Sequence, residues 1–130
     1  MKVLKYFSVI LVAVLLACSC FAADIPDSFK TAKARALCAP ENENGAHYIV
    51  KTVGDTEYSV GYIPDHSIIG CSVEEGSYVV IVTMDENSGE CQAGILMNHA
   101  LVQSENVDCK DADKAMQIVL KKMFPETISF

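Results

Sequence analysis

Two β-rich runs separated by a Gly-Asp pair limit the fold of this chain more than any other feature of its sequence. The runs are HYIVKTV, residues 47–53, and TEYSVGYI, residues 56–63. A two-residue connection that begins with glycine is typical of a β-hairpin with a type II′ turn, and this turn fixes the register of the strands. The expected cross-strand pairs are Val53–Thr56, Lys51–Tyr58, Ile49–Val60 and His47–Tyr62.

A second hairpin is expected further along the chain. The apolar run YVVIVTM, residues 78–84, lacks polar alternation and therefore predicts a strand that is covered on both faces. A turn over 85–90 follows, and residues 91–103 predict the fourth strand, with Met84 opposite Cys91. Residues 64–77, between the two hairpins, predict a loop.

One helix is expected on each side of the strands, over residues 26–38 and from about 111 to 124. The second helix carries an apolar stripe at helical spacing: Ala112, Ala115, Met116, Val119, Leu120 and Met123. We therefore predict an α+β fold with a four-stranded antiparallel sheet, made of two hairpins, on which both helices pack.

Residues 1–22 have the layout of a secretory signal peptide. A short basic start precedes an uncharged run over 6–17, which is shorter than the roughly 20 apolar residues of a membrane-spanning helix. Small residues at positions −3 and −1 favour cleavage between Ala22 and Ala23. The expected mature protein is a single secreted domain of residues 23–130, with no stable membrane insertion once the signal is removed.

A bacterial lipoprotein signal is the alternative reading of the same region. Residues 15–18 would then form a lipobox, and Cys18 would carry the lipid. This alternative leaves Cys20 in the mature chain as a fifth thiol, whereas cleavage after Ala22 leaves an even number, which favours the signal peptide.

The cysteines that remain after cleavage are Cys38, Cys71, Cys91 and Cys109. An even set in a secreted domain favours disulfides, and the absence of a Cys-x-x-Cys pair disfavours zinc. A single extended strand from Cys91 to Ser104 would span about 43 Å and place Cys109 beyond its far end, and Cys71 would lie near that end too. The prediction is therefore two disulfides, and a break at Gly94 or Asn98 would reopen the other pairings. The expected bonds are Cys38–Cys91 and Cys71–Cys109.

The mature chain is strongly acidic, with a net charge of −9. Between residues 39 and 109 there are twelve acidic residues and one basic residue, Lys51. Such a surface repels phosphate backbones, so a nucleic-acid partner is not expected. The sequence contains no phosphate loop, nucleophile elbow or dinucleotide fingerprint, and we predict no catalytic residue, metal site or cofactor.

Histidines are the candidates for catalysis. Asp65, His66 and Ser67 are the residue types of a catalytic triad, but adjacent residues rarely orient a base between its partners. His47 and His99 lie in predicted strands without a metal-binding spacing. A small secreted hydrolase that uses one of these histidines remains an alternative.

The sequence favours a secreted, disulfide-stabilised binding protein that acts on an extracellular protein or small molecule. An inhibitory, defensive or host-directed role is consistent with its size, its expected secretion and its acidic middle segment. Because loops carry most binding residues, the expected contact surfaces are the loops over 39–46, 63–77 and 85–90.

Overall fold

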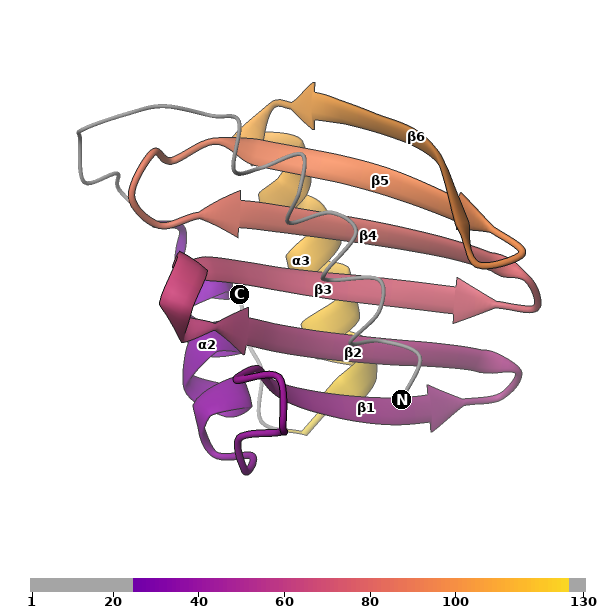
Figure 1. Cartoon of the computed structure of the whole chain (residues 1–130). Coiled ribbons are helices and arrows are strands. Elements are labelled where there is room, and N and C mark those ends of the chain that lie inside the picture. Colours follow the sequence, from indigo (N-terminus) through magenta and orange to yellow (C-terminus); the bar gives the residue numbers. More distant parts are fainter. Residues whose placement is uncertain (1–24, 127–130) are drawn as a thin grey trace.

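A six-stranded antiparallel sheet forms one layer of the protein and two helices form the other (Figure 1). The computed structural model describes residues 25–126, so the expected signal peptide and Cys18 lie outside the described residues. In chain order the elements are α2 (Asp27–Leu37), β1 (His47–Val53), β2 (Thr56–Ile63), the 3-10 helix η1 (Pro64–His66), β3 (Ile68–Glu75), β4 (Tyr78–Asp85), β5 (Cys91–Met97), β6 (Ala100–Val107) and α3 (Cys109–Met123). Each strand pairs with the next along the chain, so the sheet is a simple meander.

The first hairpin has the predicted register. Val53 lies opposite Thr56 and Ile49 lies opposite Val60, and the other two expected pairs are also present. Gly54 has a φ of +63°, a conformation that residues with a Cβ rarely adopt, as the first position of a type II′ turn requires. The Gly-Asp pair therefore sets both the turn and the pairing of β1 with β2.

The α+β class is confirmed, but the prediction of four strands is wrong, because two further strands of the sheet were not predicted. The first of these, β3, lies in the segment that was expected to be a loop, and it occupies the interior of the sheet between β2 and β4. A period-two alternation does mark it: Ile69, Cys71 and Val73 alternate with Gly70, Ser72 and Glu74. The segment was nevertheless predicted as a loop, because Gly70, Ser72 and Glu74 are small or polar.

The second strand that was not predicted is β6. The predicted fourth strand, residues 91–103, is divided between β5 and β6. The chain reverses at Asn98 and His99, which have φ values of +51° and +68°. Two successive residues with positive φ form a type I′ turn, which matches the twist of a two-residue hairpin and favours asparagine at its first position. The reversal returns the chain along β5, so that Val107 lies opposite Cys91.

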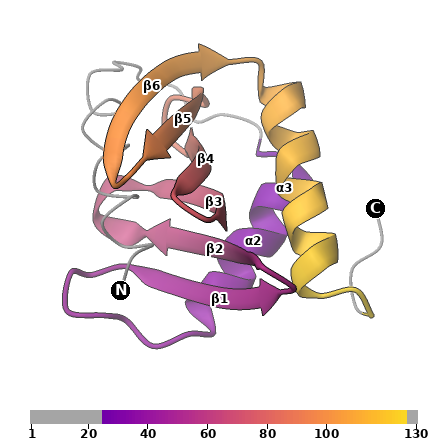
Figure 2. The same ribbon diagram turned by 90° about the vertical axis from the view of Figure 1, so that its right-hand side faces the viewer.

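Both helices pack on the same face of the sheet (Figure 2). Of the predicted stripe of α3, all residues are buried except Ala115, which is half-buried. The side chain of Asp108 accepts a hydrogen bond from the Lys110 amide and caps the start of this helix. The buried residues of this core are Phe29, Ala32, Ala36, Val60, Tyr62, Ile69, Cys71, Val82, Met84, Cys91, Ala112, Met116, Val119, Leu120 and Met123.

A second apolar cluster lies on the opposite face of the sheet. Its members are Ala46, Ile63, Ile68, Val79, Ile81 and Leu96. β4 contributes buried residues to both clusters, which confirms that this strand is covered on both faces. The continuous apolar run of β4 follows from this position in the sheet.

A band of buried polar side chains accompanies the second cluster. The hydroxyl groups of Ser59 and Ser72 hydrogen-bond to each other across β2 and β3. Within residues 25–126, Thr83 Oγ1 and Gln92 Oε1 are buried without a hydrogen-bond partner. An unsatisfied buried polar atom costs about 1–3 kcal/mol, so this band is the least well satisfied part of the sheet.

One disulfide joins Cys91 to Cys109, and the predicted pairings are wrong. Cys91 begins β5, and Cys109 begins α3 two residues after the end of β6, with a Cα–Cα distance of 5.4 Å. The predicted bonds are absent because residues 91–104 form two antiparallel strands, and the turn between them brings Cys109 back beside Cys91. Cys38 is free and exposed at the end of α2, and Cys71 is free and buried in the core.

Loss of the disulfide should destabilise the protein. We expect the double variant Cys91→Ala/Cys109→Ala to lose about 3 kcal/mol of unfolding free energy in urea, the value for a closed loop of this length. Cys38→Ser should change it by less than about 0.5 kcal/mol, because this thiol is exposed and unbonded. Peptide mapping without reduction should yield a linked Cys91–Cys109 peptide, and a Cys38–Cys91 peptide would contradict the structure.

The stability should also fall at alkaline pH because of Cys71. Burial raises the pKa of this thiol from its ordinary value of 9.0 to about 12. Above pH 9 the unfolded thiol loses its proton while the folded thiol keeps it, so the free energy of unfolding falls by about 1.4 kcal/mol per pH unit up to pH 12.

The comparison of Cys71→Ala with its parent, both carrying Cys38→Ser to limit thiol exchange, isolates this effect. Between pH 8 and pH 10.5 the parent should lose about 2 kcal/mol more unfolding free energy than the variant, measured by urea titration. Equal losses in the two proteins would show that Cys71 ionises in the folded state as readily as in the unfolded state.

Candidate functional site

Three loops from separate parts of the chain meet at one end of the sheet, which we call the loop end (Figure 1). It consists of residues 38–46, the segment 64–67 that contains η1, and the turn over 86–90. The Glu86 amide donates a hydrogen bond of 2.8 Å to the carbonyl of Ser67, which joins the second loop to the third. The expected contact loops are therefore together only in part, because residues 68–75 form β3 and residues 76–77 turn into β4 at the opposite end of the sheet.

The first and second loops also touch. A Cβ placed on Gly45 would lie 3.7 Å from Oδ2 of Asp65 and 3.7 Å from Oε1 of Glu41. Both carboxylates therefore lie beside the same point of the backbone. Gly45 has a φ of +80°, so this position is suited to glycine for its backbone conformation.

Local hydrogen bonds hold the first loop in shape. Asn42 Oδ1 accepts hydrogen bonds from the amides of Asn44 and Ala46, at 2.9 Å and 3.1 Å. His47 Nδ1 lies 2.8 Å from the carbonyl oxygen of Ala39, and it must be the donor because a carbonyl oxygen only accepts. These bonds order the loop.

The third loop is ordered by Asp85. Its Oδ1 accepts hydrogen bonds from the amides of Asn87 and Ser88, at 2.7 Å and 3.2 Å. The disulfide lies beside this loop, since Cys109 Sγ is 3.2 Å from the carbonyl oxygen of Gly89. The only covalent cross-link among the described residues therefore supports the loop end.

The loop end is acidic. Its three loops contain no lysine or arginine, and four of their carboxylate side chains are exposed. These residues are Glu41, Glu43, Asp65 and Glu90. A group of like charges on one ordered surface creates a negative potential that attracts cationic groups.

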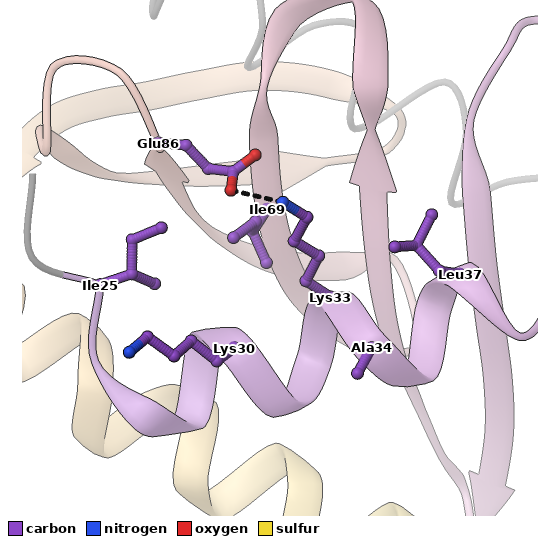
Figure 3. A pocket seen from close by; sticks show the side chains of 7 residues that line it. All are labelled: Ile25, Lys30, Lys33, Ala34, Leu37, Ile69 and Glu86. Atoms are coloured by element: carbon purple, nitrogen blue, oxygen red, sulfur yellow. Dashed lines mark hydrogen bonds and ion pairs between the residues drawn. The ribbon is translucent and has the colours of Figure 1, made fainter. Parts of the chain in front are cut away.

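A pocket of about 400 Å³ opens beside α2, next to the loop end (Figure 3). One side of α2 forms its wall, and Ile69 of β3 and Glu86 of the third loop close it from the sheet. The lining residues are Ile25, Lys30, Lys33, Ala34, Leu37, Ile69 and Glu86. The volume lies within the range of about 300–1,000 Å³ that is typical of small-molecule sites.

An ion pair between α2 and the third loop crosses this pocket. Lys33 Nζ lies 2.7 Å from Glu86 Oε2 and 4.7 Å from the centre of the Tyr62 ring. The hydrogen bond to Glu86 raises the pKa of Lys33, and burial raises the pKa of the Tyr62 hydroxyl. At neutral pH Lys33 is therefore charged and Tyr62 is neutral, which keeps the pair intact.

The three histidines do not share one place in the fold. His47 begins β1, and His66 lies in η1 at the same end of the sheet. His99 lies in the β5–β6 turn, at the opposite end of the meander. In the part of the chain that the structure describes, no group of three or more His, Cys, Asp or Glu side chains is placed to hold a metal ion.

The pocket and its ion pair were not predicted from the sequence. A signal for the pocket wall did exist, because Lys30, Lys33, Ala34 and Leu37 have the i, i+3, i+4, i+7 spacing of one helix face. Glu86 lies 53 residues from Lys33, and no local pattern connects the two.

Comparisons with protein-family models, curated proteins and solved structures found no match to this chain. Across residues 25–126, no helix combines the length and the apolar character that a membrane span needs.

Proposed function

We propose that the protein is a small secreted binding protein that recognises an extracellular protein through its loop end. The observation that carries this proposal is the union of three separate loops into one ordered acidic surface. The loops are ordered by their own hydrogen bonds, so that little conformational entropy is lost when a partner binds.

The negative charge of the loop end indicates which kind of partner surface it would bind. Four exposed carboxylates favour a partner whose contact surface is rich in lysine and arginine. Among the described residues, none of the four takes part in an ion pair, so their charges are available to a partner.

The proposal of secretion rests on the N-terminal sequence and is supported by the disulfide. Residues 1–22 have the layout of a signal peptide. An intramolecular disulfide is compatible with an oxidising compartment, where such bonds persist.

The N-terminus of the secreted protein tests this part of the proposal. We expect cleavage between Ala22 and Ala23, so the intact mass should equal that of residues 23–130 with one disulfide. N-terminal sequencing should begin at Ala23. A protein that begins at Cys18 and carries an acyl mass would instead establish the lipoprotein alternative.

Removal of charge from the loop end tests the recognition surface. The variant carries Glu41→Gln, Asp65→Asn and Glu90→Gln, which keep the side-chain size. We expect the oxidised mature variant, immobilised on a resin, to retain about ten-fold less of its partner from the extracellular fluid. Partner binding by the parent should weaken as salt is added.

A matched variant controls for net charge. Asp55→Asn, Glu75→Gln and Glu105→Gln remove the same number of charges from exposed residues outside the loop end. This control should retain the partner like the parent protein. Equal losses in the two triple variants would show that total charge, and not the loop end, governs binding.

A further inference from the structure

We propose that the pocket beside α2 is a second binding site, which takes a small aliphatic monocarboxylate. Its hydrocarbon chain would lie against Ile25, Ala34 and Leu37, and its carboxylate would lie at Lys30. This site is separate from the protein-binding surface of the loop end, although Glu86 belongs to both.

The lining of the pocket fits a hydrocarbon chain. Four of its seven residues, Ile25, Ala34, Leu37 and Ile69, are apolar (Figure 3). The aliphatic stems of Lys30 and Lys33 add further apolar surface, because long basic side chains bury their methylene groups and keep their ammonium groups in water. Leu37 leaves 46 % of its surface exposed, so contact with a ligand would remove apolar area from water.

The charges of the lining fit an anion. Lys33 and Glu86 neutralise each other across their 2.7 Å ion pair. Lys30 makes no ion pair in the described part of the chain, so the pocket has a net positive charge in a protein that is otherwise strongly acidic. An ammonium group at the edge of an apolar pocket can bind a carboxylate with a charge-assisted hydrogen bond.

The size of the pocket limits the ligand. A volume of about 400 Å³ is near the lower end of the range for small-molecule sites, which is about 300–1,000 Å³. It suits a single short hydrocarbon chain, whereas a phospholipid with two long chains needs more room. The ligand class is therefore a medium-chain monocarboxylate.

Titration with sodium decanoate tests the proposal. The oxidised mature protein, labelled in its methyl groups, is titrated below the concentration at which decanoate forms micelles. We expect saturable NMR shifts of the Ile25, Ala34, Leu37 and Ile69 methyl groups. Shifts confined to methyl groups elsewhere in the protein would overturn the proposal, as would the absence of saturable binding.

Decanol and decylamine identify the head group that the pocket selects. Both have the same hydrocarbon chain, but decanol is neutral and decylamine is positively charged at neutral pH. Decanoate should bind more tightly than either. Equal affinity for decanol would rule out recognition of the carboxylate, and tighter binding of decylamine would assign recognition to Glu86.

Two variants locate the contacts. Lys30→Gln should weaken decanoate binding by about three- to five-fold, the upper part of the range for an exposed charge pair, and should leave the affinity for decanol unchanged. Lys114→Gln removes one exposed lysine from α3 and should leave both affinities within about two-fold. An equal effect of the two substitutions on decanoate would overturn the assignment of Lys30.

Ala34→Phe tests the apolar part independently. Ala34 is exposed on α2, so the larger side chain can be accommodated without disturbing the core and should occupy the pocket. Binding of decanoate and decanol should both be lost. Unchanged binding would place the hydrocarbon chain elsewhere. Retention of the protein partner by the same variant tests the loop end separately, so that either proposal can fail alone.

Discussion

The reversal of the chain at Asn98 and His99 is the constraint on which the rest of the structure depends. Because both residues adopt positive φ, β6 returns along β5 and brings Cys109 to within bonding distance of Cys91. The disulfide then fixes the start of α3 at the loop end, and the apolar stripe of α3 crosses the sheet from this point. Without the reversal, α3 would begin at the opposite end of the sheet, and neither the cross-link nor the helix-covered core could form in this arrangement.

The same arrangement creates the two candidate binding surfaces. In a meander, alternate connections lie at the same end, so η1 and the β4–β5 turn are neighbours although β3 and β4 separate them in sequence. The loop after α2 joins them because β1 begins at this end. α2 packs on the sheet through Phe29, Ala32 and Ala36 and leaves its other side facing Glu86. The acidic loop end and the pocket are thus neighbours because of one topology, and the Lys33–Glu86 pair joins them.

Patterns within a short segment predicted the first hairpin and the helices. They did not predict features that depend on residues far apart in the chain. Gly54 determined the β1–β2 register, and the stripe of α3 predicted its buried face. The interior strand β3 was missed because its small and polar residues resemble those of a loop, although its apolar residues alternate correctly. The expected disulfides were wrong because one turn within residues 91–104 was not predicted. Without this turn Cys91 and Cys109 would lie at opposite ends of a long strand, whereas with it they are neighbours. Of the candidate site, the contact loops were predicted in part and the pocket was not.

The sequence by itself determined the α+β class, the two helices, the first hairpin and the acidic character of the loops, because each depends on residues that are close together in the chain. Only the tertiary structure decided the number of strands, the pairing of the cysteines and the meeting of Lys33 with Glu86. These features join residues that are far apart in sequence, and their distances depend on every turn between them. A pattern within one segment contains the preference of that segment for helix or strand, but it does not contain the position of the segment relative to the others.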